Sequence, residues 1–331
     1  MEKRLLGNSN VSASVITFGA WAIGGWMWGG ADRKEAIGAI RASYDLGVTS
    51  IDTAPAYGHG LSEEIVGEAI RGMDRDKVQI LTKYGLRWDT DEGEFYFKTK
   101  DNFGKDLNMH KFASKGSIIK ELEASLKRLN TDYIDLYQIH WPDPTTPVSE
   151  TMEAVERLIE QGKIKAAGVC NYSAALMKEA NKYALLASNQ IPYSMLRREN
   201  EKEVIPYAMN HDIAIIVYSP LQKGLLTGKM KPGYHFNEGD SRKHESNYTD
   251  ENLKRVDSFL KKLKPLANEK NATLAQLVIR WTLQQPGITI VLVGARNPKQ
   301  SVENAGAVKF KLSEEEISFI NDQLSKVELI L

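Results

Sequence analysis

The sequence of 331 residues contains a single cysteine, Cys170, so it can form neither an intramolecular disulfide nor a cysteine-based zinc cluster. It also lacks an apolar run of the ~18 residues that a helix needs to cross a bilayer. Its first residues lack the apolar core of a signal peptide. We therefore expect a cytoplasmic protein that has no membrane partner.

The sequence has no excess of charge of either sign. Lys and Arg total 43, Asp and Glu also total 43, and the formal net charge is zero. A chain with this balance has no general electrostatic attraction to nucleic acid or to an anionic membrane. A local basic site for a small phosphate remains compatible with it, so a small molecule is the expected partner.

Short apolar runs alternate with longer amphipathic segments along the whole chain. Eight runs predict strands at 15–21, 49–54, 78–84, 134–140, 164–170, 187–193, 214–220 and 288–295. These runs are apolar without alternation, which is typical of a parallel sheet covered by helices on both faces. Eight strand–helix units fit a closed (β/α)8 TIM barrel better than an open sheet. No break in composition divides the chain, so residues 1–331 are expected to form one domain.

The amphipathic segments predict helices between the strands. They lie at 32–46, from Ser62 onward, at 117–130, 149–161, after Ser173, and at 199–210, 250–270, 273–284, 298–307 and 313–327. Asp32 is the expected N-cap of the first helix. The last segments predict extra C-terminal helices. At the other end, "KRLL" and "VSASV" on either side of "GNSN" predict a small N-terminal β-hairpin across the bottom of the barrel.

Two segments are longer than ordinary connections and are expected to be binding elements. Residues 85–114 carry Trp88, Phe95, Tyr96 and Phe97, which favours an ordered segment. Residues 221–249 follow the seventh strand and are polar enough that we expect them to be mobile.

Three ionisable residues stand at the ends of consecutive strands. Asp52, Lys83 and His140 end the second, third and fourth strands, and Tyr57 lies on the loop that leaves Asp52. Strands of a parallel barrel end at one rim, so these side chains should be neighbours. Each residue alone has an ordinary structural explanation, such as a turn cap, a solvated strand end or a packed ring. Their shared position on three adjacent strands favours an active site.

This group of residues is suited to protonating a carbonyl oxygen. A free tyrosine is a weak acid at neutral pH, and a nearby Lys83 ammonium is expected to lower the pKa of Tyr57. Asp52 would hold that ammonium, and a neutral His140 would donate a hydrogen bond to the carbonyl oxygen. The arrangement fits proton donation while hydride arrives at the carbonyl carbon.

The stretches "DTAPAYG", "LTK" and "LYQIHWPD", in this order on successive strands, resemble the signature of the aldo-keto reductase family. The similarity continues in "GAW" (19–21), "GVCNYS" (168–173), "YSPLQKGLLTGK" (218–229) and "GARNPKQSVENAGA" (294–307). The local pattern is similar to a bacterial branch with general stress and inositol-linked reductases, and to potassium-channel β-subunits. The resemblance implies a (β/α)8 barrel that reduces an aldehyde or ketone to an alcohol with NADPH. Asp52, Tyr57, Lys83 and His140 match its catalytic residues.

No G-x-G-x-x-G follows a strand, so a Rossmann-type site is not supported, and the cofactor must be bound by barrel loops. The resemblance implies that Tyr218 stacks on the nicotinamide, that Asn171 and Gln190 hold its carboxamide, and that 219–226 wraps the pyrophosphate. Arg296, at the start of a helix, is the candidate for the adenosine 2′-phosphate. The full set implied for NADPH or NADP+ is Gly19, Trp21, Asp52, Asn171, Gln190, Tyr218, Ser219, Pro220, Leu221, Lys223, Gly224, Leu225, Lys229, Gly294, Arg296, Gln300, Glu303 and Asn304.

The sequence departs from the family pattern at a few of these positions. Cys170 stands where many relatives have serine, and it is expected to be a buried small residue. Gly294 and Gln300 replace basic residues of some branches, which would weaken phosphate binding. The residues expected to contact the carbonyl substrate are Trp21, Trp28, Tyr57, Trp88, His140 and Trp141.

Two other functions compete with a reductase. A non-catalytic or slow NADPH-binding sensor subunit would keep the same residues, but the chain begins almost directly at the barrel, without an extension for a partner. A metal-dependent hydrolase would use Asp52, His59 and His140, but a histidine pair on the first strand and a third ligand are lacking. No metal site is therefore expected. The chain is expected to be a monomer or a weak homo-oligomer.

Overall fold

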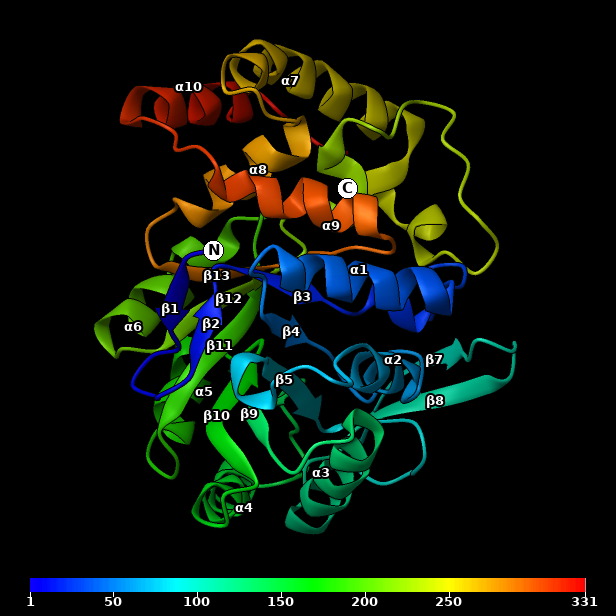
Figure 1. Ribbon diagram of the computed structural model, residues 1–331, viewed down its shortest axis with the longest axis vertical. Helices are drawn as coiled ribbons and strands as arrows, with labels where there is room; N and C mark the ends of the chain where they lie inside the picture. Colours follow the sequence, from blue (N-terminus) through cyan, green and yellow to red (C-terminus); the bar gives the residue numbers. More distant parts are fainter. Residues whose placement is uncertain (331) are drawn as a thin grey trace.

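Eight parallel strands close into a barrel in the computed structural model, which describes residues 1–330 (Figure 1). The strands are β3 (Ile16–Gly19), β4 (Ser50–Asp52), β5 (Gln79–Tyr84), β9 (Ile134–Ile139), β10 (Ile164–Cys170), β11 (Leu186–Pro192), β12 (Ala214–Tyr218) and β13 (Ile288–Gly294). Around the barrel they follow chain order, and β13 pairs with β3 to close it. Every residue of β5, β9 and β11 is buried, which explains why these strands are apolar without alternation. The predicted (β/α)8 barrel is confirmed.

Helices surround the barrel, and most follow their predicted positions. They are α1 (Arg33–Asp45), α2 (Leu61–Ala69), α3 (Lys115–Leu129), α4 (Val148–Glu160), α5 (Ala174–Ala180), α6 (Val204–Asn210), α7 (Asp250–Glu269), α8 (Leu274–Leu283), α9 (Pro298–Ala305) and α10 (Glu314–Leu324). The Asp32 carboxylate accepts a hydrogen bond from the Glu35 amide at 2.8 Å, as expected for the N-cap of α1. None of the helices in residues 1–330 is both long and apolar enough to cross a membrane.

The helix predicted at 199–210 is shorter than expected. Residues Glu199–Glu201 form a separate 3-10 turn, and α6 begins at Val204. Pro206 has no amide hydrogen, so it could not donate to the carbonyl of Lys202 in a continuous helix. As the third residue of α6, it occupies the first turn, where a missing donor costs no helical hydrogen bond.

A small hairpin closes the lower end of the barrel, as predicted. Strands β1 (Lys3–Leu5) and β2 (Ser12–Ser14) pair antiparallel. Leu6, Val11 and Ala13 from this hairpin form one buried cluster with apolar residues of the barrel strands, among them Leu81 and Leu136. The opposite rim, where the carboxyl ends of the strands meet, is left uncovered by this hairpin.

The segment 85–114 is ordered, as predicted, but its strands were not foreseen. Strands β6 (Leu86–Arg87), β7 (Glu94–Lys100) and β8 (Asp106–Lys111) form a three-stranded antiparallel sheet in the order β6-β8-β7. The β7–β8 hairpin projects from the barrel beside α2 (Figure 1). β7 consists of half-buried and exposed residues, and β8 has only Met109 and His110 buried, so neither strand has the apolar run that reveals the barrel strands.

The segment 221–249 is attached to the barrel rim, whereas its polarity suggested a mobile loop. It contains the 3-10 turns Gln222–Thr227, Ser241–His244 and Ser246–Tyr248. Asp240 and Arg242 form a buried ion pair at 2.6 Å, and a β-bridge joins Asp240 to Trp28. These contacts hold the segment against the loop that follows β3.

Candidate active site

A cavity of about 1230 Å³ opens at the rim where the carboxyl ends of the strands meet. Gly19, Asp52, Cys170, Tyr218 and Gly294 line it, each the last residue of a different barrel strand. Pockets for drug-sized ligands usually measure roughly 300–1,000 Å³, so this cavity has room for a dinucleotide and a second small molecule.

Asp52, Lys83 and Tyr57 meet at the base of this cavity. The Lys83 ammonium donates to the Asp52 carboxylate at 2.6 Å, to the Thr53 carbonyl at 2.9 Å and to the Tyr57 hydroxyl at 3.2 Å. Lys83 is fully buried, whereas Tyr57 is partly exposed to the cavity. A buried ammonium needs a counter-charge, and Asp52 supplies it at hydrogen-bond distance. The predicted convergence of these three side chains is present.

His140 lies beside Tyr57. It follows β9 directly, and its ring is 5.6 Å from the Tyr57 ring at an interplanar angle of 80°. Burial and the nearby Lys83 ammonium lower the pKa of His140 well below its ordinary value. The imidazole is therefore neutral at pH 7 and can donate one ring N–H to a ligand oxygen.

The pKa of Tyr57 was predicted in the wrong direction. Burial raises it to about 12, although the Lys83 ammonium acts in the opposite, predicted sense. Desolvation penalises the phenolate more than one ammonium stabilises it. For Lys83 the balance is reversed, because burial lowers its pKa but Asp52 and Tyr57 together raise it above the ordinary value. At neutral pH the pair is thus a protonated phenol beside an ammonium.

Two glutamines hold the second oxygen of Asp52. Gln190 donates to Asp52 Oδ2 at 2.7 Å, and Gln138 donates to the same oxygen at 3.3 Å. The Gln190 amide nitrogen lies also 3.2 Å from Gln138 Oε1. Gln190 was expected to hold a carboxamide, and in this structure its nitrogen is engaged by Asp52. Gln138 was missed, although a glutamine inside the apolar run "IDLYQIH" is the signal that could have found it.

Asn171 and Tyr218 line the cavity above His140. The Asn171 side chain donates to the His140 carbonyl at 3.2 Å and accepts from the Tyr218 hydroxyl at 3.0 Å. Burial raises the pKa of Tyr218, Arg197 opposes that rise, and the nearby Tyr57 and Tyr96 add to it. Tyr96, on the β7–β8 hairpin, lines the same cavity.

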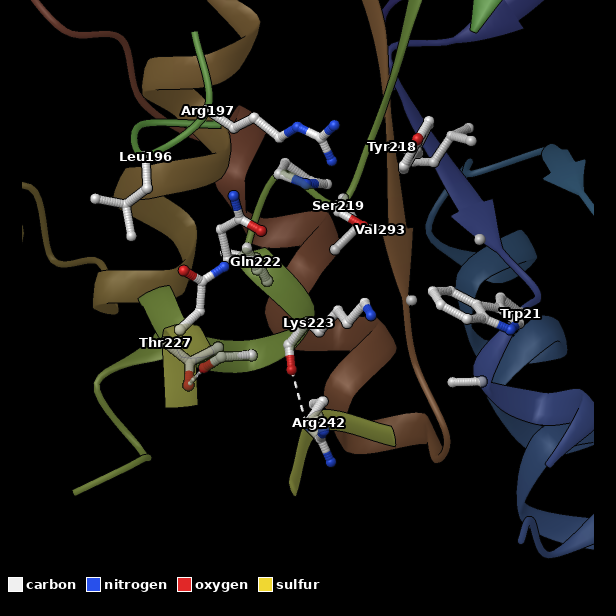
Figure 2. A pocket seen from close by; sticks show the side chains of 18 of the residues that line it. Trp21, Leu196, Arg197, Tyr218, Ser219, Gln222, Lys223, Thr227, Arg242 and Val293 are labelled. Carbon is white, nitrogen blue, oxygen red and sulfur yellow. Dashed lines mark hydrogen bonds between the residues drawn. The ribbon is translucent and has the colours of Figure 1, made fainter. Parts of the chain in front are cut away.

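The turn after β12 forms another wall of the cavity. Ser219, Gln222 and Lys223 have φ angles of 57°, 45° and 47°, and Gly224 has 101°. Figure 2 shows the Lys223 side chain extending toward Trp21, and its ammonium lies 5.2 Å from the Trp21 ring centroid. Arg242 donates to the Lys223 carbonyl at 2.7 Å, which holds the turn in this conformation.

The start of α9 completes the wall. The Gln300 side chain accepts from the Arg296 amide at 2.8 Å, and Asn304 donates to the Gly294 carbonyl at 3.1 Å. Lys229 reaches from the turn after β12 and pairs with Glu303 at 2.8 Å. These contacts bring the two cofactor segments predicted from the sequence to the same end of the cavity.

Most residues that the resemblance assigned to the cofactor line this cavity. They are Gly19, Trp21, Asp52, Asn171, Gln190, Tyr218, Ser219, Pro220, Leu221, Lys223, Gly224, Lys229, Gly294, Arg296, Gln300, Glu303 and Asn304. The side chain of Leu225 does not, because it is buried in the hydrophobic core. Gln222 lies in the predicted pyrophosphate segment 219–226 and also lines the cavity. Arg242 lines it from the long segment 221–249, which was predicted as a binding element without naming this residue, and Arg197 lines it without having been predicted.

The predicted substrate residues divide into two groups. Trp21, Trp28, Tyr57, His140 and Trp141 line the cavity. Trp88 lies behind its wall instead.

His59 lies there too, with its ring 5.2 Å from that of Trp88 and 5.3 Å from that of Trp26. Within residues 1–330, His, Cys, Asp and Glu side chains form no group of three that could hold a metal ion. Cys170 is buried at the cavity base, where burial raises the pKa of its thiol.

The donors at the α9 end fit a phosphate-bearing cofactor. Lys223, Lys229 and Arg296 line the cavity; Lys223 is paired with Glu245 and Lys229 with Glu303. The turn after β12 adds backbone amides in left-handed conformations, which form the kind of concave surface that binds anions. The pyrophosphate of a nicotinamide dinucleotide would fit this end of the cavity, and its flat nicotinamide ring would fit the end beside Tyr218.

Comparison with known proteins agrees with this geometry. A model of the Aldo/keto reductase family matches residues 15–324. The chain is 42% identical to the aldo-keto reductase YhdN of Bacillus subtilis (strain 168), over 97% of this chain and 93% of that protein. It is 35% identical to the NADH-specific methylglyoxal reductase of Escherichia coli (strain K12), over 99% and 100%. The structure of a glycerol dehydrogenase from Gluconobacter oxydans matches with a TM-score of 0.87 at 35% identity, over 98% and 95%. Because the family match includes all eight barrel strands, the chain belongs to the aldo/keto reductase family and is an oxidoreductase.

Proposed function

We propose that the protein reduces the carbonyl group of an aldehyde or ketone to an alcohol with NADPH, and that Tyr57 donates the proton. The observation that carries this proposal is the 3.2 Å contact between the Tyr57 hydroxyl and the buried Lys83 ammonium, at the base of a large cavity.

The residues have distinct roles in the proposal. Tyr57 is protonated at neutral pH because its pKa is about 12, so it is ready to donate to a carbonyl oxygen. Neutral His140 donates a hydrogen bond that orients the same oxygen. The phenolate left behind is stabilised by Lys83, whose charge Asp52 balances. The bound nicotinamide would supply the hydride.

NADPH is proposed over NADH on the basis of Arg296. Lys223 and Lys229 pair with Glu245 and Glu303, whereas no ion pair of Arg296 is found within residues 1–330. A guanidinium on the cavity wall that is not neutralised by a carboxylate suits a 2′-phosphate. Because the relative from Escherichia coli is NADH-specific, coenzyme preference must be measured. We also propose that the protein acts in the cytoplasm, on a small molecule, as a monomer or weak homo-oligomer.

Steady-state assays test the function. Purified protein is mixed with NADPH and a panel of aldehydes and ketones, and the nicotinamide absorbance is followed. Enzyme-dependent loss of NADPH with formation of the alcohol is the expected result. Tight NADPH binding without turnover of any carbonyl would contradict the proposal and favour a regulatory, NADPH-sensing subunit.

A further inference from the structure

The β7–β8 hairpin contributes an aromatic wall to the cavity. Tyr96 and Phe97 from β7 line it together with Trp26 and Met27 from the loop after β3, and with Trp141. All five side chains are aromatic or apolar. We refer to these five residues as the aromatic box. The hairpin thus reaches the active site, although it lies outside the strand–helix repeat.

A bulge in β7 allows two neighbouring residues to face the same cavity. Side chains of consecutive strand residues normally point to opposite faces. In β7 the pairing with β8 shifts between Phe95, opposite His110, and Phe97, opposite Met109, which leaves Tyr96 without a partner in the register. Bulges of this kind redirect side chains. As a result, Tyr96 and Phe97 both line the cavity.

The aromatic box is fixed by contacts within it and to the hairpin. The Phe97 ring stacks on Trp26 with centroids 6.3 Å apart and planes 11° apart, and Tyr96 lies 5.4 Å from Trp141. The Trp26 indole donates to the Thr99 hydroxyl at 3.0 Å. Aromatic pairs held in this way present a preformed flat surface.

The box is tied to the proton donor through the backbone. The Asn102 side chain, near the hairpin turn, donates to the Gly24 carbonyl at 2.8 Å. Gly24 lies against the Tyr57 backbone so closely that an added Cβ would be 2.7 Å from the Tyr57 carbonyl oxygen. Trp141 also follows His140 directly. The position of the box relative to Tyr57 and His140 is therefore fixed.

We propose that the β7–β8 hairpin selects the substrate, and that the aromatic box favours carbonyl compounds that carry a flat aryl group over small polar dicarbonyls. This inference rests on the proposed reductase function. An aryl group buries its faces against the five side chains. A small polar dicarbonyl covers little of this apolar surface, and within the box only the Tyr96 hydroxyl and the Trp141 indole could donate to it, because Trp26 already donates to Thr99.

The test compares two probe substrates at saturating NADPH, benzaldehyde and methylglyoxal. We expect kcat/KM for benzaldehyde to exceed that for methylglyoxal by about tenfold or more, and Phe97→Ala and Tyr96→Ala to lower this ratio about tenfold. Phe103→Ala is the matched control, because that phenyl group is on the same hairpin and 95% exposed. Equal losses for both substrates in Phe97→Ala, or a wild-type preference for methylglyoxal, would overturn the proposal.

Two further measurements distinguish a loss of substrate selectivity from a loss of stability or of catalytic activity. Thr99→Val keeps the box side chains but removes the hydrogen bond to Trp26, and it should lower kcat/KM for benzaldehyde more than kcat/KM for methylglyoxal. Because it leaves the Trp26 indole N–H unpaired, its melting temperature is measured to confirm that the variant is folded under the assay conditions. If the wild type reduces no carbonyl at all, the proposed function fails. The aryl site is then tested by titrating each protein with benzyl alcohol and following the quenching of tryptophan fluorescence. The Kd for benzyl alcohol should be lower in the wild type and in Phe103→Ala than in Phe97→Ala. An unchanged Kd in Phe97→Ala would reject the aryl site.

Discussion

The Lys83 ammonium donates to the Tyr57 hydroxyl over 3.2 Å, and this contact joins a fully buried charge to a side chain that faces the cavity. Asp52 lies on the other side of the ammonium at 2.6 Å. The Lys83 ammonium, held by Asp52, can therefore stabilise the negative charge that develops on the Tyr57 oxygen when the phenol gives up its proton. Stabilisation that appears only in the transition state lowers the activation barrier of a reaction.

Removal of the Tyr57 hydroxyl should abolish most of the activity. In Tyr57→Phe we expect kcat/KM for carbonyl reduction to fall about 10²–10⁴-fold, because general acid catalysis is lost. NADPH binding, measured by fluorescence titration, should persist. Tyr84→Phe is the control, because the Tyr84 hydroxyl is buried without a hydrogen-bond partner in the described residues. Full activity in Tyr57→Phe would remove Tyr57 from the mechanism.

The two directions of the reaction should depend differently on pH. In the proposed mechanism reduction needs protonated Tyr57. Burial raises its pKa to about 12, so the phenol stays protonated and kcat/KM for reduction should be flat from about pH 6 to 10. His140 should add no inflection near its ordinary pKa, because that pKa lies well below it. Alcohol oxidation needs the phenolate, so log kcat/KM should rise with a slope near one per pH unit. A plateau in oxidation at neutral pH would contradict the raised pKa of Tyr57.

Asp52 and Lys83 should contribute to the free energy of unfolding in a strongly coupled, non-additive way. Lys83→Met leaves a buried carboxylate without its partner, and should lower the free energy of unfolding by about 3–5 kcal/mol. Asp52→Asn should also destabilise the protein. The double variant should lose less than the sum of the two single losses, because no unpaired charge remains. Urea denaturation of all four proteins measures the coupling, and additive losses would argue against it.

Arg296 should determine coenzyme preference. Arg296→Ala should raise KM for NADPH about tenfold or more while changing KM for NADH little, since only NADPH carries the 2′-phosphate. Lys299→Ala is the matched control, because Lys299 is an exposed cation in the first turn of α9, just after Arg296. Equal changes for both coenzymes would assign Arg296 a role outside 2′-phosphate recognition.

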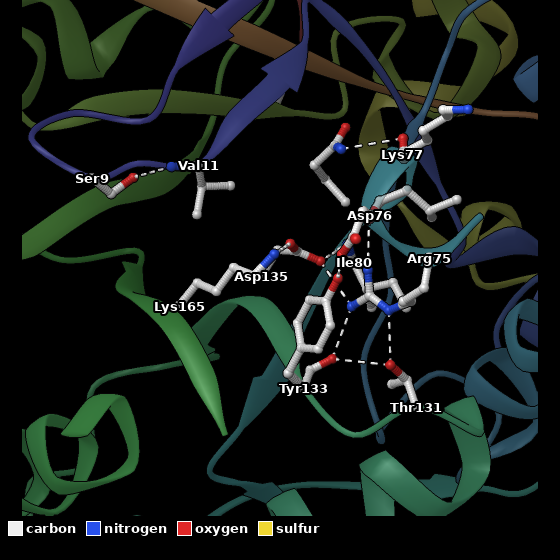
Figure 3. Close-up of polar contacts among 12 residues, drawn as sticks. Ser9, Val11, Arg75, Asp76, Lys77, Ile80, Thr131, Tyr133, Asp135 and Lys165 are labelled. Carbon is white, nitrogen blue, oxygen red and sulfur yellow. Dashed lines mark hydrogen bonds and ion pairs between the residues drawn. The ribbon is translucent and has the colours of Figure 1, made fainter. Parts of the chain in front are cut away.

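At the opposite end of the barrel, Asp135 should be important for stability. Figure 3 shows its carboxylate among Arg75, Lys165 and the Ile80 amide, with distances of 2.8, 3.1 and 2.9 Å. Asp135→Asn should lower the free energy of unfolding by about 3 kcal/mol, because it leaves the Arg75 charge without its buried partner. Asp76→Asn, an exposed carboxylate in the same network, should change it by about 0.5 kcal/mol or less. Activity at low temperature should be unaffected in both.

The barrel and the meeting of Asp52 with Lys83 were predictable because both follow from chain order. Strands buried on both faces must be apolar throughout, so the eight runs are visible in the sequence. A parallel barrel brings their carboxyl ends together, which places Asp52 and Lys83 in contact without further information.

Other features depend on packing that the sequence does not express. The β7–β8 hairpin is half exposed, and it lines the cavity with two adjacent side chains only because β7 has a bulge at Tyr96. The direction of the Tyr57 pKa depends on how deeply its hydroxyl is buried, which no motif states. Leu225 is buried in the hydrophobic core and Trp88 packs against His59, so neither lines the cavity.

The hairpin that closes the lower end of the barrel has a consequence for proton supply. Leu6, Val11 and Ala13, with the apolar strand residues above them, separate Lys83 from solvent on that side, in the part of the chain that the structure describes. If Tyr57 donates a proton as proposed, solvent can replace that proton only through the rim at which the cavity opens. The alcohol product would leave the barrel through the same opening.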